Sequence, residues 1–284
     1  MNKLKRIAAI HDISGFGKCS LTVALPILSA AGIEVSVIPT AVLSSHTGDL
    51  TGFTYRDLTD DMPGFVKQWK QLDLHFEALY SGFLGSYEQI AIVSEMFDTF
   101  KTEDTFIMVD PVMADSGVLY QTVTPQMADG MVSLCKKADL IVPNFTEAAY
   151  LLGEKYHEGP YTRDYVENLL RRLSELGPQQ VVITGVWFSP DLLGAAGYCR
   201  NTDEVSYAFS QKVKGRYYGT GDVFASALLS GILNEMKLDI AMQLAADFTA
   251  GCIRRTREAG TDARFGVNFE AGLLKFMREL GITE

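Results

Sequence analysis

Short apolar segments alternate with longer amphipathic segments along most of the chain. The apolar segments lie at residues 6–10, 34–38, 78–81, 105–109, 139–142 and 181–184. Between them, segments such as residues 87–100, 125–137 and 163–176 carry apolar residues at intervals of three and four, which predicts helices. Strands that alternate with helices in this way are typical of βαβ units, and so predict a mostly parallel sheet covered by helices.

The pattern changes after residue 184. Two apolar stretches at residues 193–199 and 205–209 are separated by the turn-rich sequence RNTD, which predicts a hairpin at a sheet edge. Three helical stretches, at about residues 222–236, 239–256 and 269–280, close the chain. Because no repeat, low-complexity tract or flexible linker interrupts the sequence, we expect residues 1–284 to form a single α/β domain.

Composition narrows the class of protein. Of the 284 residues, 47% are hydrophobic, which is enough to bury a large core and argues against disorder. The formal net charge of -10 argues against a nucleic-acid partner, because phosphate backbones are bound mainly by Lys and Arg. The N-terminal region has only a short apolar run, so we expect a cytoplasmic protein without a membrane segment.

The cysteines form no pair or cluster with the spacing of metal ligands. Cys19, Cys135, Cys199 and Cys252 lie far apart in the sequence. We therefore predict four buried thiols in a reducing compartment, without disulfides or a cysteine metal site.

Polar residues follow each predicted strand, where ligands bind in open α/β sheets. Turns favour Asp, Asn and Gly for local backbone reasons alone, so no single position decides the matter. Six strand ends together give a larger set, namely His11-Asp12, Thr40 with the loop at 44–48, Gly82, Asp110 with Asp115, Asn144 with Glu147, and Thr184-Gly185.

The sequence GTGD at residues 219–222 carries the sharpest signal, since it leads directly into an apolar, alanine-rich helix. Two glycines let backbone amides approach an anion, and the helix N-terminus adds free N–H donors and a positive dipole end. A carboxylate there would repel a phosphate, so Asp222 is predicted to be a base or a metal ligand beside the reacting oxygen. The alternative is that Asp222 caps the helix.

Two familiar glycine motifs are excluded. The segment at residues 12–20 lacks the first glycine of a P-loop, and Cys19 stands where Ser or Thr would hold magnesium. It also lacks the third glycine of the dinucleotide fingerprint, and no acidic ribose partner follows near Ile38. Neither a P-loop NTPase nor a Rossmann dehydrogenase is supported.

Three motifs together resemble the ribokinase-like superfamily: DPVMAD at residues 110–115, NFTE at 144–147 and GTGD at 219–222. They occur in the order and at the spacing of that superfamily, and the resemblance covers essentially the whole chain. The sequence SHTG at residues 45–48, the DPVM motif and the loop at 116–124 are most similar to pyridoxal and pyridoxamine kinases. The resemblance implies a three-layer α/β/α ribokinase-like fold with a mostly parallel central sheet.

The resemblance also implies an activity: transfer of the γ-phosphoryl group of ATP to the 5′-hydroxyl of pyridoxal, pyridoxine or pyridoxamine. Asp222 would be the general base that deprotonates this alcohol. The amides of Gly219, Thr220 and Gly221 would form the anion hole for charge on the transferred group. The family pattern further implies a homodimer.

Roles for the remaining site residues come from the same resemblance. Mg²⁺ would be organised, partly through water, by Asp110, Asp115 and Glu147. The substrate ring would lie beside His46 and Thr47, with a contribution from Asp12 and Ser14 in the loop after the first strand. ATP would contact a set spread over several strand ends, namely Asp115, Asn144, Thr184, Gly185, Val213, Thr220 and Gly221.

Two departures from the pyridoxal kinase pattern keep alternatives open. Those kinases usually carry a Ser after the first strand, whereas HDISG at residues 11–15 is more similar to the Asp-x-Ser-Gly-Gly loop of hydroxymethylpyrimidine kinases. The pyrimidine kinases, however, tend to have Cys at the position of Asp222. Val142 replaces a Thr often found in the family, so the sequence does not decide whether a monovalent cation binds there. The alternatives are therefore a hydroxymethylpyrimidine kinase and a non-catalytic vitamin or nucleotide binding protein.

Overall fold

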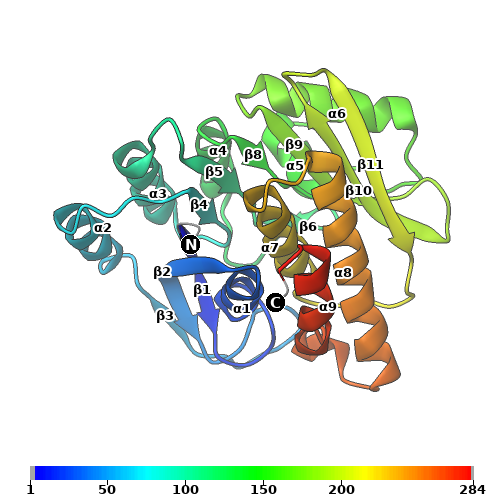
Figure 1. Cartoon of the computed structure of the whole chain (residues 1–284), viewed down its shortest axis with the longest axis horizontal. Coiled ribbons are helices and arrows are strands. Elements are labelled where there is room, and N and C mark those ends of the chain that lie inside the picture. Colours follow the sequence, from blue (N-terminus) through cyan, green and yellow to red (C-terminus); the bar gives the residue numbers. More distant parts are fainter. Residues whose placement is uncertain (1–3, 283–284) are drawn as a thin grey trace.

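The structure, a computed structural model, describes residues 4–282 and is built around a nine-stranded sheet (Figure 1). The strand order is β11-β10-β9-β8-β5-β4-β1-β2-β3. In chain order the strands are β1 (Lys5–Ser14), β2 (Ile33–Leu43), β3 (Tyr55–Asp57), β4 (Ala78–Ser81), β5 (Phe106–Val109), β8 (Leu140–Ile141), β9 (Gln180–Val186), β10 (Leu192–Cys199) and β11 (Glu204–Gln211).

The sheet is mostly parallel, as predicted. The six central strands from β2 through β1, β4, β5 and β8 to β9 all pair in parallel. Antiparallel pairs occur only at the two edges of the described sheet, where β3 pairs with β2 and the β10–β11 hairpin pairs with β9. The predicted hairpin at residues 193–209 is therefore confirmed, and it lies at an edge (Figure 1).

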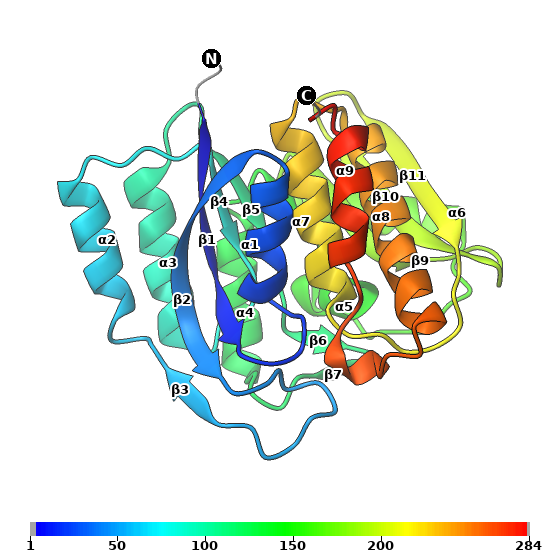
Figure 2. The ribbon, with the colours of Figure 1, turned by 60° about the horizontal axis from the view of Figure 1, so that its bottom comes forward.

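Helices cover both faces of the sheet and complete three layers. Four helices pack with one apolar cluster and lie side by side in Figure 2: α1 (Leu21–Ala30), α7 (Thr220–Leu233), α8 (Leu238–Glu258) and α9 (Leu273–Glu279). Five helices pack with the cluster on the other face: α2 (Met62–Gln71), α3 (Tyr87–Phe100), α4 (Pro125–Cys135), α5 (Phe145–Leu152) and α6 (Arg163–Glu175).

Consecutive strand residues face opposite clusters, which explains the continuous apolar runs of the parallel strands. In β5, for example, Ile107 and Val109 belong to one cluster and Met108 to the other. Strands buried on both faces need apolar residues at every position rather than at alternate ones. The predicted three-layer α/β/α fold is confirmed.

Local sequence sets the helix boundaries where side chains cap the first turn. Ser86 accepts a hydrogen bond from the Gln89 amide at the start of α3, and Thr162 does the same for α6. Helix α5 begins with a capping box. The Asn144 side chain accepts a hydrogen bond from the Glu147 backbone N–H, and the Glu147 side chain accepts one from the Asn144 backbone N–H. The capping box places both residues at the carboxyl end of β8.

Several predicted elements differ from the structure. The stretch at 269–280 begins with a 3-10 turn, Glu270–Gly272, so helix α9 covers only its second half. The loop at 116–124 contains part of a small hairpin, formed by β6 (Ala114–Asp115) and β7 (Val118–Leu119). The cysteines are free thiols, as predicted, but only Cys135 and Cys252 are buried, whereas Cys19 and Cys199 are partly exposed. Among the described helices, none has the length and apolar character needed to span a bilayer.

Candidate active site

The carboxyl ends of the parallel strands open into a cavity of about 630 Å³. Its walls come from the ends of β1, β2, β5, β8 and β9, from the β6–β7 hairpin, from β10, β11 and the segment that follows them, and from α7 and α8. All residues to which the sequence assigned a role line this cavity: Asp12, Ser14, His46, Thr47, Asp110, Asp115, Asn144, Glu147, Thr184, Gly185, Val213, Gly219, Thr220, Gly221 and Asp222. Of the larger set at the strand ends, His11, Thr40 and Gly82 do not line it, and the side chains of His11 and Thr40 are completely buried.

The first turn of α7 forms one wall of the cavity. The helix begins at Thr220, with Gly219 as its N-cap at φ 72°. A side chain at position 219 would bring its Cβ within 1.9 Å of the carbonyl oxygen of Lys18, so only glycine fits. Asp222 is the third residue of the helix and not its cap, so the capping alternative is wrong. The first-turn N–H groups lack intrahelical acceptors and are available to an anion.

Asp222 has the electrostatic properties of a base. Burial raises the pKa of its carboxyl group to about 7. The backbone N–H of Ser20, which hydrogen-bonds to this carboxylate, lowers the pKa, and the negative charge of Asp12 raises it. A carboxylate with a pKa near neutrality can both accept a proton from an alcohol and release it to solvent.

The end of β1 holds a second buried carboxylate. Asp12 and Ser14, predicted in the loop after the first strand, lie within β1 because the strand continues to Ser14 in pairing with β2. The Oδ1 atom of Asp12 accepts a hydrogen bond from Ser20 Oγ at 2.5 Å, and Oδ2 accepts one from Ser14 Oγ at 3.0 Å. Ser20 has a positive φ of 52°, which aims its N–H and hydroxyl at two different carboxylates. The segment that fails the P-loop pattern therefore positions Asp12 and Asp222. The sequence motif alone did not reveal Ser20.

Asn144 and Glu147 hold the start of α5 against the residues that follow β5. The Asn144 Oδ1 atom accepts hydrogen bonds from the amides of Thr146 and Glu147, and its Nδ2 donates to the Ala114 carbonyl at 2.8 Å. The Glu147 carboxylate accepts from the Asn144 amide at 2.8 Å and from the Met113 amide at 3.2 Å. Both side chains are thus largely engaged in structure while they line the cavity.

The acidic cluster fits a hard divalent cation. Asp110 is 7% exposed and Glu147 is 3% exposed. Burial raises the pKa of Asp110 well above its ordinary value, and the negative charges of Glu147 and Asp222 raise it further. Burial also raises the pKa of Glu147 to about 8. A cation would relieve this repulsion, and carboxylate oxygens are the donors that Mg²⁺ prefers.

The cluster does not form a complete metal cage. In residues 4–282, no three His, Cys, Asp or Glu side chains are grouped closely enough to ligate one ion. Mg²⁺ commonly keeps several water ligands and uses one or two carboxylates together with substrate phosphates. The donor set therefore matches a magnesium nucleotide better than a permanently bound metal.

His46 lies in the cavity wall with both ring nitrogens engaged. Its Nδ1 accepts a hydrogen bond from the Gly48 amide at 3.0 Å, so the proton resides on Nε2, which lies 2.5 Å from the Arg264 carbonyl oxygen. The imidazole also stacks on Tyr218, with 5.5 Å between ring centroids. His46 can therefore offer ring surface to a ligand, whereas its nitrogens hold the surrounding backbone.

Cationic and aromatic residues of the cavity were missed in the sequence. Lys212 and Arg216 line it on either side of Val213, and Tyr218 directly precedes Gly219. Proximity to GTGD is the only signal that the sequence offered for them. Cys19 also lines the cavity, but burial raises the pKa of its thiol well above the ordinary value, so it is not an activated nucleophile.

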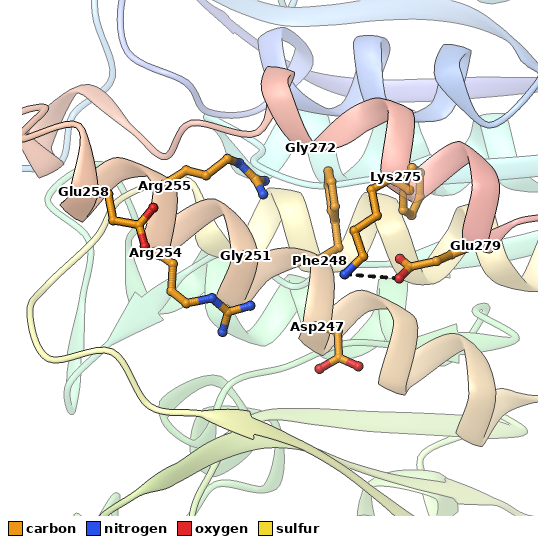
Figure 3. Close-up of a pocket in the computed structure, with 10 residues that line it drawn as sticks. Asp247, Phe248, Gly251, Arg254, Arg255, Glu258, Gly272, Lys275 and Glu279 are labelled. Carbon is orange, nitrogen blue, oxygen red and sulfur yellow. Dashed lines mark ion pairs between the residues drawn. The ribbon is translucent and has the colours of Figure 1, made fainter.

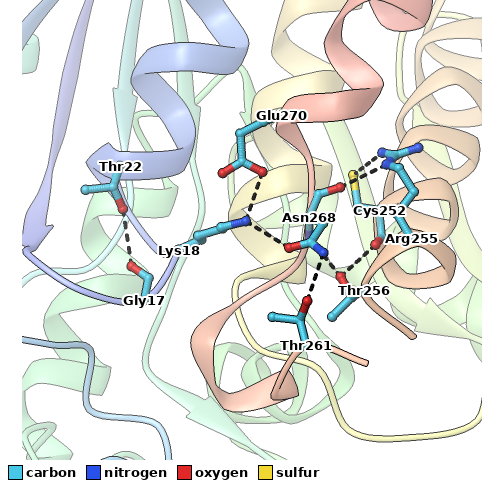
Figure 4. A network of polar contacts seen from close by, with 9 residues as sticks. All are labelled: Gly17, Lys18, Thr22, Cys252, Arg255, Thr256, Thr261, Asn268 and Glu270. Atoms are coloured by element: carbon cyan, nitrogen blue, oxygen red, sulfur yellow. Dashed lines mark hydrogen bonds and ion pairs between the residues drawn. The ribbon is translucent and has the colours of Figure 1, made fainter. Parts of the chain in front are cut away.

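A polar network connects the β1–α1 loop with the last turns of α8 and the segment that follows α8 (Figure 4). The Lys18 Nζ atom donates to Asn268 Oδ1 at 3.0 Å and pairs with Glu270 at 2.9 Å. The backbone carbonyl oxygen of Asn268 accepts a hydrogen bond from Arg255 Nε, and the backbone N–H of Asn268 donates one to Thr256 Oγ1 at 2.7 Å. The network ties the β1–α1 loop to α8. Because the Lys18 carbonyl packs on Gly219, it also supports the start of α7.

A smaller cavity of about 140 Å³ lies between α8 and α9 (Figure 3). It contacts the side of α8 that carries Asp247, Gly251 and Arg254, whereas Ala246, Thr249 and Ile253 of the same helix face the large cavity. None of the predicted site residues lines it. The candidate chemistry therefore belongs to the large cavity.

Known proteins share this architecture. The chain matches the phosphomethylpyrimidine kinase family model over residues 39–266. A Bacteroides thetaiotaomicron protein assigned to the phosphomethylpyrimidine kinases, crystallised with pyridoxal, is 40% identical, with a TM-score of 0.92 and 96% of each chain covered. Pyridoxal kinase from Lactobacillus plantarum is 29% identical, with a TM-score of 0.89, 97% of this chain and 98% of that chain covered.

Curated relatives include both kinase activities. Pyridoxal kinase PdxY of Vibrio campbellii is 25% identical over 268 residues, which cover 90% of each protein. Hydroxymethylpyrimidine/phosphomethylpyrimidine kinase of Aquifex aeolicus is 28% identical over 192 residues, which cover 66% of this chain and 71% of the relative. The resemblance drawn from the three sequence motifs is confirmed. The chain belongs to the phosphomethylpyrimidine kinase family of the ribokinase-like superfamily.

Proposed function

We propose that the protein transfers the γ-phosphoryl group of MgATP to the 5′-hydroxyl of a vitamin B6 alcohol: pyridoxal, pyridoxine or pyridoxamine. One observation carries this proposal. A carboxylate with a pKa of about 7 stands in the first turn of a helix whose free N–H groups face the same cavity as a buried acidic cluster. The pyridoxal kinases among the relatives and the pyridoxal in the Bacteroides crystal structure support the choice of substrate.

Asp222 performs the proton transfer in this proposal. The alcohol oxygen forms a bond to the γ-phosphorus while the bond to the bridging oxygen of ADP breaks, and the alcohol proton moves to the Asp222 carboxylate. The N–H groups of Gly219, Thr220 and Gly221 stabilise the negative charge on the transferred group. The proton then passes to solvent, since Asp222 borders the open cavity.

Magnesium is assigned to the acidic cluster. Asp110 and Asp115 would hold the ion, with Glu147 acting through water because its oxygens already accept backbone N–H groups. When bound, the ion neutralises charge on the ATP phosphates. The nucleotide would also contact Asn144, Thr184, Gly185 and Val213, together with the first turn of α7.

The alcohol is assigned to the wall formed by Asp12, Ser14, His46 and Thr47, on the side of Asp222. His46 would contribute the face or edge of its ring, as both nitrogens are engaged. The proposal further includes a single domain over residues 1–284 and a cytoplasmic location, as the sequence pattern predicts, and a homodimer, as the family resemblance implies.

A second candidate is a hydroxymethylpyrimidine kinase with the same mechanism. The Asp12-x-Ser14 loop and the match to the phosphomethylpyrimidine kinase model favour it. A binding protein without activity is less well supported, because binding alone does not require a base beside an anion hole.

A coupled assay of ADP release separates these candidates. Purified protein is supplied with MgATP and, in turn, pyridoxal, pyridoxine, pyridoxamine or hydroxymethylpyrimidine. The proposal predicts that kcat/KM is highest for one of the three pyridine alcohols. Preferential turnover of the pyrimidine would assign the second candidate instead. If none of the four alcohols supports ADP release, the proposed kinase activity is refuted for all of them.

A further inference from the structure

Two loops that are far apart in sequence meet at the mouth of the cavity. The rim loop (residues 44–54) connects β2 to β3, and the approach segment (residues 212–219) connects β11 to α7. Tyr218 of the approach segment donates its hydroxyl hydrogen to Asp49 Oδ2 of the rim loop. Arg216 lies 3.7 Å from the same oxygen, and its guanidinium lies over the Tyr218 ring at 5.3 Å.

Tyr218 also packs against the rest of the rim loop. Its ring stacks on His46 with an interplanar angle of 23°. The backbone of Gly48 approaches so closely that a Cβ at this position would lie 2.6 Å from the Tyr218 ring. The tyrosine therefore contacts three of four consecutive rim-loop residues, 46, 48 and 49, and does so immediately before Gly219.

The conformation of the rim loop depends on such contacts. Asp49 has a φ of 55°, which is a left-handed conformation. This conformation is unfavourable in free energy for any residue other than glycine. Conformations of this kind persist where surrounding contacts determine them. The hydrogen bond from Tyr218 and the charge of Arg216 both act on this strained residue.

The Asp49–Tyr218 pair lies at the exposed rim of the cavity. The side chains of Asp49 and Arg216 are 57% and 67% exposed, whereas the carboxylates of Asp110 and Glu147 are buried. Burial and the hydrogen bond to Asp49 raise the pKa of Tyr218 to about 12, so its hydroxyl remains a donor at neutral pH. The pair is thus suited to holding the two loops together.

We propose that Tyr218 is a positioning residue, which holds the rim loop in the conformation that receives the alcohol by donating a hydrogen bond to Asp49. It acts through His46 and Thr47 and not on the reacting atoms. This inference rests on the proposed function and deepens it, because it links the alcohol site to the segment that leads into the anion hole.

The test compares Tyr218→Phe and Asp49→Asn with a matched control, Tyr207→Phe. The Phe variant keeps the ring that stacks on His46 and removes only the hydroxyl. Tyr207→Phe removes a similar bond, from Tyr207 to Glu167 at 2.9 Å, at a residue that does not line the cavity. A partly exposed charge-assisted hydrogen bond changes an equilibrium by about three- to tenfold.

The alcohol KM at saturating MgATP is expected to rise by about three- to tenfold in each rim variant, with kcat within about twofold of wild type. The double variant should show no rise beyond that of Tyr218→Phe, since Asp49→Asn removes only the charge that strengthens the bond already lost in Tyr218→Phe. The control should match wild type. An unchanged KM in Tyr218→Phe, or additive effects in the double variant, would overturn the proposal.

Hydrogen exchange gives a readout that does not depend on turnover. Amides of residues 46–50 should exchange faster in Tyr218→Phe and Asp49→Asn than in wild type or in Tyr207→Phe. Equal exchange in all four proteins would refute the positioning role even if the kinase is active. If wild type phosphorylates none of the alcohols, the proposed function fails while the exchange data still decide whether Tyr218 holds the rim loop.

Discussion

Replacement of Asp222 by Asn separates its catalytic role from its effect on stability. The variant keeps the size of the side chain and its place in the first turn of α7 but cannot accept a proton. General base catalysis contributes about 10²- to 10⁴-fold to a rate, which corresponds to about 2.7 to 5.5 kcal/mol of transition-state free energy. We therefore expect kcat with the preferred alcohol to fall by about that factor, with little change in the Kd of MgATP.

The free energy of unfolding of Asp222→Asn at pH 8 should rise, whereas its kcat should fall. The folded-state pKa of Asp222 is raised from 3.8 to about 7, so the folded protein binds this proton more tightly than the unfolded chain. The stabilisation from the bound proton is fully present below pH 3.8 and is lost as pH rises through about 7. At about 1.36 kcal/mol per tenfold change in proton affinity, ionisation of Asp222 destabilises the folded state by up to about 4 kcal/mol at pH 8. Hydration of the carboxylate by water in the cavity reduces this cost.

The assay combines coupled ADP release with urea unfolding at pH 8 and pH 5. Asp222→Asn should be nearly inactive and more stable than wild type at pH 8, and the stability difference should shrink at pH 5. Asp239→Asn, which changes an aspartate in the first turn of α8 that does not line the cavity, is the matched control and should alter neither quantity markedly. Near-normal kcat in Asp222→Asn would refute the assignment of the base, and lower stability at pH 8 would refute the electrostatic reasoning.

Three further predictions concern the same site. The pH profile of kcat/KM should lose activity as pH falls below about 7, because Asp222 must be ionised to act; a profile flat to pH 5 would contradict this. Gly219→Ala should abolish turnover and lower the free energy of unfolding by about 1 to 3 kcal/mol, as its Cβ would meet the Lys18 carbonyl; calorimetry and the ADP assay measure both effects. Glu147→Gln should cost about 1 to 2 kcal/mol of stability, since it weakens the capping box with Asn144, and should raise the Mg²⁺ concentration needed for half-maximal rate; an unchanged Mg²⁺ dependence would remove Glu147 from the metal site.

Local sequence predicted the elements whose residues carry their own signals. The helix at residues 87–100 was predicted because apolar residues recur there at helical spacing, and α3 has the same bounds, with Ser86 as its cap. Strand β4 was predicted without error because all of its residues are buried and three of the four, Ala78, Leu79 and Tyr80, belong to the apolar core. Strand β3 was missed, since its three exposed residues show no alternation and only pairing with β2 makes them a strand.

The site could be predicted as a set because parallel strands end at one edge of a sheet. Residues from five strand ends and from the start of α7 consequently line one cavity. Individual contacts could not be predicted in the same way. The hydrogen bond from Tyr218 to Asp49 joins residues 169 positions apart, and the amide that reaches Asp222 belongs to Ser20, which has a positive φ. Such contacts depend on loop geometry, which has no periodic signature.

The central claim is tested most directly by phosphorus NMR of wild-type protein incubated with MgATP and a vitamin B6 alcohol. The account predicts that the signal of the γ-phosphate disappears as ADP and the 5′-phosphate ester of the alcohol appear in equal amounts, and that Asp222→Asn leaves the spectrum almost unchanged over the same time. Formation of inorganic phosphate in place of the ester, or an equal yield of ester with the Asn variant, would contradict it.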